Sequence, residues 1–191
     1  MQIERHPFEP FLPEGAVVLF LGSFPPQPKR WSMEFYYPNW LNDFWRVCGL
    51  VFFGDRDHFV VSGEKRFDVD RIKAFCTEKG IALFDTATAV RRLQDNASDK
   101  FLEVVEPADI SALLRRIPAC RAVVTTGEKA TGVLVEMFAC EAPKVGQSSG
   151  ISVDGRALQF FRMPSTSRAY PLSLEKKAAA YEGLFRALTL L

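Results

Sequence analysis

The chain has 191 residues, of which 48% are hydrophobic and 25% charged, and its formal net charge is +1. This composition is typical of a single globular domain, here spanning residues 1–191, and no stretch is apolar enough to span a membrane. Because the net charge is close to zero, it gives no overall electrostatic argument for a nucleic-acid partner.

The N-terminal residues 1–7 lack the apolar segment of a signal peptide, so we expect a cytoplasmic protein. The first strong signal is the run at 16–21, which predicts a buried strand because it is short, continuously apolar and closed by Gly and Pro. A loop with one glycine and two prolines follows at 22–26, and then a cluster of aromatic and amide residues at 36–45. Such side chains together suit a flat, polar ligand such as a nucleobase.

Short apolar runs further along the chain predict three more strands. They cover 81–84, 121–124 and the second arm of a hairpin over 151–163, in which Asp154-Gly155 fits a type I′ turn. The segment before this hairpin, 146–150, is rich in Gly and Ser and is predicted to be a loop.

Helices are predicted between the strands by apolar residues that recur on one face. They cover 41–51, the segment from Asp68 to Gly80, a segment from Pro107 to Ile117, the segment after Gly127, and the chain from Ser173 to its end. Asp68 and Ser173 have the position of N-caps, and Gly80 that of the residue that ends a helix. The polar segment 91–106 predicts a loop with little regular structure. Residues 96–99 predict an ordinary turn, with a position bordering the DNA as the alternative.

Strands and helices thus alternate, which predicts an α/β fold: a three-layer α/β/α arrangement with a mostly parallel, four-stranded central sheet. Ligands bind beyond the carboxyl ends of such strands. Four loops therefore converge on one edge: 22–26, 85–88, 125–127 and 164–168.

The chemistry expected at this edge is limited by what the loops lack. Neither histidine, His6 or His58, falls on the predicted edge, which argues against a Ser-His-Asp triad and removes the usual general base. The sequence Gly127-Glu128-Lys129 is not a P-loop. The four cysteines (Cys48, Cys76, Cys120 and Cys140) contain no close pair, so we expect buried or half-buried thiols and no metal site.

The loops at this edge resemble motifs of the uracil-DNA glycosylase superfamily, most closely its mismatch-specific uracil and hypoxanthine-DNA glycosylase branches. The resemblance rests on the order and spacing of five segments: 22–26, 36–45, 80–85, 126–130 and 164–167. It implies a monofunctional DNA glycosylase that hydrolyses the N-glycosidic bond of a flipped-out deaminated base, uracil or hypoxanthine, in base excision repair. It also implies DNA as the partner, no metal and no organic cofactor, and we expect a monomer.

Carried over residue by residue, the resemblance implies a pocket wall and a base-binding face. Gly22, Ser23 and Phe24 form the wall under the base, and Tyr36 or Tyr37 stacks on it, with one of the two tyrosines packed instead. Thr126 stands where relatives end the third strand in Asn.

The resemblance implies catalysis by Asn42, for which a helix-surface amide is the alternative, with Asp85 as the second candidate. Asp85 either positions water or caps a turn after its strand. Phosphates would be held by Ser165, Thr166 and Ser167. Arg168 lies beside them and is a further candidate for DNA binding, in a basic segment, 156–177, that either neutralises phosphates or forms a solvated helix end.

Several departures from the family pattern bear on activity, among them Thr126 in place of Asn and Asn39-Trp40 where the hypoxanthine branch often has His-Pro. The first loop has Ser23 and Phe24 where strongly uracil-active members place an Asn or Asp that activates water, and Met163 replaces a histidine. Two alternatives therefore stay open: an inactive relative that binds nucleic acid, and an enzyme that processes nucleosides or nucleotides.

Overall fold

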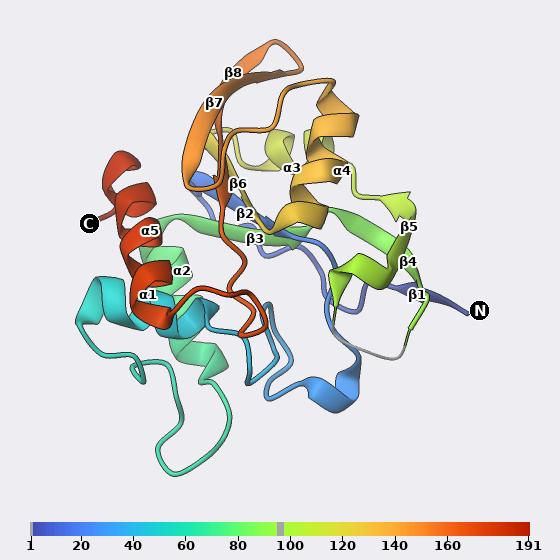
Figure 1. The fold of residues 1–191 in the computed structure, drawn as a ribbon. Coiled ribbons are helices and arrows are strands. Elements are labelled where there is room, and N and C mark those ends of the chain that lie inside the picture. Colours follow the sequence, from blue (N-terminus) through green and yellow to red (C-terminus); the bar gives the residue numbers. More distant parts are fainter. Residues whose placement is uncertain (1, 95–97) are drawn as a thin grey trace.

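The computed structural model describes residues 2–94 and 98–191 (Figure 1). Its central sheet has five strands in the order β3-β2-β6-β8-β7. They are β2 (Val18–Gly22), β3 (Ile81–Asp85), β6 (Ala122–Thr126), β7 (Gln147–Val153) and β8 (Arg156–Met163). The first four in this spatial order are parallel, and β7 pairs antiparallel to β8. The α/β class and the mostly parallel sheet are confirmed.

The predicted number of four strands is wrong, because β7 adds a fifth. The hairpin signal covered only the end of β7, whereas residues 147–150, predicted to be a loop, continue the strand. These residues are polar and mostly exposed, since β7 is the edge of the sheet and its pairing uses backbone groups alone. The turn is as predicted: Asp154 and Gly155 have φ of 51° and 78°, as a type I′ turn requires.

A second, antiparallel sheet has the order β1-β4-β5. It contains β1 (Ile3–Arg5), β4 (Ala87–Arg92) and β5 (Leu102–Pro107), so the prediction of a loop over 91–106 is wrong where β4 and β5 lie. The charged residues that suggested a loop pair across the strands, as Arg91 does with Glu103 at 2.7 Å and Arg5 with Glu106 at 2.8 Å. Residues 95–97 lie outside the described part, so the predicted turn at 96–99 is described only at its end.

The described residues contain five α-helices: α1 (Phe44–Phe53), α2 (Val69–Lys79), α3 (Ile110–Arg116), α4 (Glu128–Phe138) and α5 (Leu174–Ala187). In Figure 1, α1, α2 and α5 gather on one side of the central sheet, and α3 and α4 on the other. The first group shares an aromatic core in which Phe52 packs on Phe75 at 4.9 Å and on Phe185 at 4.8 Å between ring centroids. Among the described residues, no helix is long and apolar enough to cross a membrane.

The ends of the helices follow their capping residues. Asp68 and Ser173 accept hydrogen bonds from backbone N–H groups of the first turn, and Gly80 ends α2 with φ of 68°, as predicted. Two predicted starts are wrong. α1 begins at Phe44, three residues late, because Asn42 forms a bridge with Ser167 instead, and α3 begins after the N-cap Asp109, because Pro107 still belongs to β5.

The register of the parallel strands brings the four predicted loops together. Gly22 lies beside Asp85, and Thr126 beside Met163, so β3, β2, β6 and β8 end at the same edge. β2 lies between two parallel neighbours, which explains its uninterrupted apolar sequence. Cys48, Cys76 and Cys120 are buried free thiols and Cys140 is half-buried, as predicted.

Candidate active site

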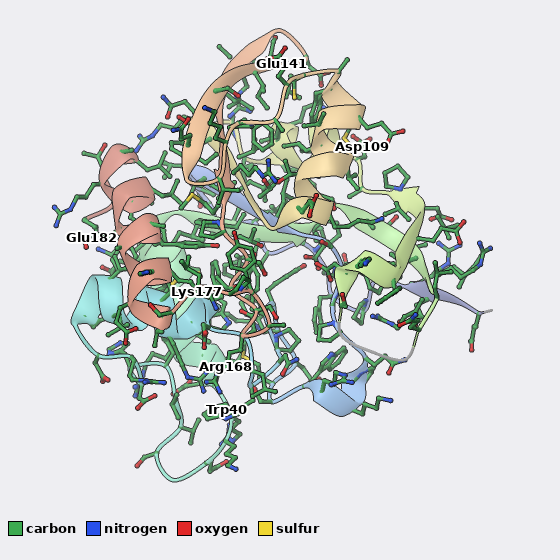
Figure 2. The ribbon with its side chains drawn as sticks, viewed as in Figure 1. Trp40, Asp109, Glu141, Arg168, Lys177 and Glu182 are labelled. Atoms are coloured by element: carbon green, nitrogen blue, oxygen red, sulfur yellow. The ribbon has the colours of Figure 1, made fainter. Side chains whose placement is uncertain are left out.

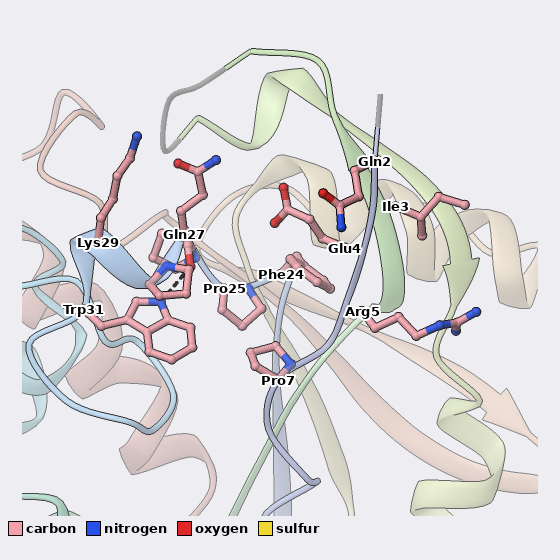
Figure 3. A pocket seen from close by; sticks show the side chains of 12 residues that line it. Gln2, Ile3, Glu4, Arg5, Pro7, Phe24, Pro25, Gln27, Lys29 and Trp31 are labelled. Atoms are coloured by element: carbon pink, nitrogen blue, oxygen red, sulfur yellow. Dashed lines mark hydrogen bonds between the residues drawn. The ribbon is translucent and has the colours of Figure 1, made fainter.

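A cavity of about 1370 Å³ lies at this edge of the sheet. Its lining includes all the predicted catalytic, base-binding and phosphate-binding residues except Arg168: Gly22, Ser23, Phe24, Tyr36, Tyr37, Asn42, Asp85, Thr126, Ser165, Thr166 and Ser167. A smaller cavity of about 570 Å³ lies between β1 and the segment 24–31 (Figure 3). Its floor is proline and aromatic. Three charged residues line it, Glu4, Arg5 and Lys29, and the first two are paired with Arg92 and Glu106, so we place the chemistry in the larger cavity.

Asp85 is held in place by His6, and the prediction that neither histidine reaches this edge is therefore wrong. The Nε2 of His6 lies 2.7 Å from Oδ2 of Asp85, and both side chains are at most 10% exposed. The histidine arrives because the N-terminal segment runs along β3, where Phe11 pairs with Leu83. No periodic pattern marks this segment, so nothing in it predicted the contact.

Gly22 is required for the same arrangement. A Cβ atom at this position would lie 2.4 Å from Oδ1 of Asp85, which is closer than any side chain allows. The His6 ring thus holds the carboxylate of Asp85 at Oδ2, and Oδ1 occupies the space that a Cβ at position 22 would need.

Asp99 is a second carboxylate in the cavity, and the sequence analysis placed it in a turn without assigning it a catalytic role. It begins the 3₁₀ turn η2 (Asp99–Phe101), and its Oδ2 accepts a hydrogen bond of 2.8 Å from the hydroxyl of Ser23. Burial, reinforced by the charge of Asp85, raises the pKa of Asp99 to about 6, although the Ser23 hydrogen bond opposes the shift. The first loop thus carries no carboxylate of its own but touches one.

Asn42 organises the loop before α1. Its Oδ1 accepts two hydrogen bonds, from the backbone N–H of Phe44 at 2.9 Å and from the hydroxyl of Thr166 at 2.8 Å. Within the described residues its Nδ2 donates to no partner. Asn42 is therefore more than a helix-surface amide. It joins the aromatic segment (36–45) to the serine-rich loop (164–168) and leaves its amide N–H groups available.

Tyr37 and Tyr36 both line the cavity, and Tyr36 is the more deeply buried of the two. The Tyr37 ring stacks on Phe44 with centroids 3.9 Å apart, and its hydroxyl lies 2.9 Å from Oγ1 of Thr126. Tyr36 is 3% exposed and donates its hydroxyl to the carbonyl of Glu9. Burial raises the pKa of both tyrosines far above its ordinary value, so both hydroxyls stay protonated.

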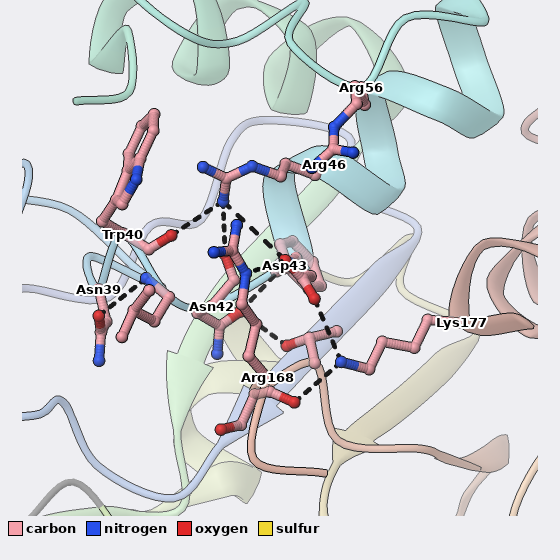
Figure 4. Close-up of polar contacts among 12 residues, drawn as sticks. Asn39, Trp40, Asn42, Asp43, Arg46, Arg56, Arg168 and Lys177 are labelled. Carbon is pink, nitrogen blue, oxygen red and sulfur yellow. Dashed lines mark hydrogen bonds and ion pairs between the residues drawn. The ribbon is translucent and has the colours of Figure 1, made fainter. Parts of the chain in front are cut away.

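The basic segment 156–177 does not form one continuous phosphate-binding strip, although Lys176 is exposed in the first turn of α5. Lys177 is 1% exposed and donates to Oδ2 of Asp43 at 3.2 Å (Figures 2 and 4). Arg156 donates to the backbone carbonyls of Leu114, Ile117, Pro118 and Cys120. These two cations are structural.

Arg168 is the member of this segment that stays half exposed next to the cavity. Its Nε donates to Oδ1 of Asp43 at 3.1 Å, and Arg46 lies 4.0 Å from the same oxygen (Figure 4). One carboxylate thus faces three cations, Arg46, Arg168 and Lys177, which leaves an excess of positive charge beside the serine-rich loop. Burial and the neighbouring Arg168 lower the pKa of Arg46.

Arg30 is another basic residue of the cavity that sequence reasoning missed. It ends the short helix η1 (Pro28–Arg30), lines the cavity, and its Nε is buried without a hydrogen-bond partner among the described residues. A buried donor without a partner is costly, and an anionic ligand would satisfy it.

The sequence matches no protein-family model and no curated protein. Among solved structures, the fold is similar to the solution structure of a candidate uracil-DNA glycosylase from Methanosarcina acetivorans, with a TM-score of 0.65. The two sequences are 23% identical, and the match covers 98% of this chain and 99% of that one. This similarity is one of fold.

Proposed function

We propose that this protein is a monofunctional DNA glycosylase that removes a deaminated base, uracil or hypoxanthine, as the first step of base excision repair. The observation that carries the proposal is the convergence of four sequence-distant loops on one cavity that combines a rigid tyrosine, an amide, carboxylates and hydroxyls. The resemblance of these loops to the mismatch-specific and hypoxanthine-specific branches of the superfamily supports it.

The cavity suits a base that has been rotated out of the duplex. Unstacking costs about a few kcal/mol, and stacking on an aromatic ring returns about 1–3 kcal/mol for each base. Tyr37 lines the cavity and is already held by Phe44 and Thr126, which reduces the conformational freedom that it would lose when a base stacks on it. Backbone groups of Gly22, Ser23 and Phe24 would read the edge of the base.

The bond that breaks, between C1′ of the sugar and the base, needs stabilisation at both ends. Negative charge develops on the leaving base, where the Nδ2 group of Asn42 is an available donor. Positive charge develops on the sugar, where the carboxylate of Asp85, held by His6, is the complementary group. The hydroxyls of Ser165, Thr166 and Ser167, with Arg168 and Arg30, would hold the phosphates on either side.

The size of the cavity favours a polymer over a free nucleoside. Sites for small molecules usually enclose about 300–1,000 Å³, and this cavity is larger, at about 1370 Å³. One observation favours the alternative of an inactive relative that binds nucleic acid. Oδ1 of Asn42 already accepts two hydrogen bonds that hold the loop, which is a structural role.

One assay separates the enzyme from the binding protein. The full chain is incubated with end-labelled duplexes that contain a single uracil, hypoxanthine or xanthine, and alkali then converts abasic sites to strand breaks. We expect breaks only after alkali, on a uracil or hypoxanthine duplex. Binding to these duplexes without breaks on any of them would refute the enzyme.

Asn42→Asp tests the amide without dismantling the loop, because it keeps the Oδ1 acceptor and removes the Nδ2 donors. We expect it to slow cleavage at least ~100-fold, the scale of one lost transition-state donor. The matched control is Asn39→Asp, since Asn39 also accepts a backbone N–H two residues later, from Leu41 at 2.9 Å. Equal rates for the two variants would place catalysis elsewhere in the cavity.

A further inference from the structure

We propose that Asp99 is the residue that takes the proton from the attacking water, a role that rests on the glycosylase function proposed above. Hydrolysis needs a group that accepts this proton, and in this cavity the choice is among carboxylates. The hydroxyl of Ser23 fixes the orientation of the Asp99 carboxylate through the 2.8 Å bond to Oδ2. This bond places Asp99 against the first loop, beneath the predicted position of the base.

The other carboxylates of the cavity are less suited. Asp85 has one oxygen on the His6 ring and the other against Gly22, so it is positioned to orient water and to face a developing cation. Glu128 lies exposed at the start of α4, and Glu136 two turns further along the same helix, outside the four loops. His6 itself is 4% exposed behind Asp85.

The surroundings of Asp99 give it the strength of a base that works near neutral pH. Burial and Asp85 on β3 raise its pKa, whereas Ser23 after β2, Arg92 on β4 and Lys129 on α4 lower it, and the balance is a pKa of about 6. At pH 7 the carboxylate is therefore mostly ionised. It is also a stronger base than an ordinary aspartate, which is the condition for efficient general-base catalysis.

The step balances without any further reactant. The water oxygen forms a bond to C1′ while the bond from C1′ to the base nitrogen breaks and its electron pair leaves with the base. One proton passes from the water to the Asp99 carboxylate. It then passes from the protonated Asp99 to solvent or to the departing base, which restores the carboxylate for the next turnover.

The test is the pH dependence of single-turnover cleavage of the deaminated duplex by the full chain. For the wild type we expect the rate to fall below a pH of about 6. Asp99→Asn should lower the rate at pH 7.5 by at least ~100-fold, within the range for a lost general base, and should abolish this fall. Ser23→Ala should move the fall to higher pH, because the Ser23 hydrogen bond lowers the pKa of Asp99.

Glu141→Gln is the control, since Glu141 is an exposed carboxylate on the loop after α4, far from Arg168 in Figure 2. If Asp99→Asn cuts within threefold of the wild-type rate and still loses activity at low pH, the role of Asp99 is refuted but the glycosylase function is not. A wild type that cuts none of the duplexes would overturn both. If Asp99→Asn does not fold, an unmoved pH profile in Ser23→Ala overturns the inference.

Discussion

The raised pKa of Asp99 predicts a stability penalty that can be measured without any substrate. The folded state holds this proton up to a pH of about 6, whereas an unhindered aspartate loses it near 3.8. Between these values the folded chain binds more protons than the unfolded chain, so the contribution of Asp99 to stability becomes less favourable as the pH rises. The penalty is complete above pH 6 and disappears below the unfolded pKa.

The size of the effect follows from the two pKa values. Each unit of difference between the folded and unfolded pKa corresponds to about 1.36 kcal/mol. The destabilisation by Asp99 is therefore about 3 kcal/mol at pH 8 and about 0.5 kcal/mol at pH 4. Asp99→Asn removes the charge but keeps an oxygen that accepts from Ser23. We therefore expect the variant to be more stable than the wild type by about 1–3 kcal/mol at pH 8 and by less than about 1 kcal/mol at pH 4.

Urea unfolding followed by tryptophan fluorescence and circular dichroism measures this difference, with Glu141→Gln as the control that should match the wild type at both pH values. Equal stability of Asp99→Asn and the wild type at pH 8 would refute the reasoning, because it would mean that the carboxylate is not destabilised by its surroundings. A variant less stable than the wild type at every pH would refute it as well.

Two further substitutions test the geometry of the site and the DNA contact. Gly22→Ala should displace the carboxylate of Asp85 and slow cleavage by about 10²-fold, the scale of a misplacement of about 1 Å. The control is Gly183→Ala, where an added Cβ meets no atom within 4 Å, and it should cut at the wild-type rate. If Gly22→Ala also cuts at the wild-type rate, the position of Asp85 is unimportant for cleavage. Arg168→Ala should weaken DNA binding across sequences and reduce the slope of log affinity against log salt concentration by about 1. Arg186→Ala, on the outer face of α5, should do neither. An unchanged slope in Arg168→Ala would mean that Arg168 touches no phosphate.

The sequence was most informative where one element determines the structure by itself. The apolar run of β2 and the caps Asp68, Gly80 and Ser173 identified their elements because each acts within its own segment. The strand ends also converge as predicted, since parallel pairing aligns them at one edge.

The sequence was least informative where the partner is distant in the chain. The strands β4 and β5 are charged because their side chains pair with one another across the sheet, a relation that local polarity does not reveal. His6 reaches Asp85 across 79 positions and Asp99 reaches Ser23 across 76. Such contacts depend on the complete fold, which is why His6 and Asp99 had no signature of their own in the sequence.

The central claim is that this cavity cuts a glycosidic bond, and release of the free base tests it most directly. The full chain in molar excess is mixed with a duplex that carries one hypoxanthine or one uracil, and the filtrate is analysed by mass spectrometry. We predict one free base for each abasic site, with an intact strand until alkali is added. A duplex that is bound but releases no base, at any pH from 5 to 9, would contradict the account.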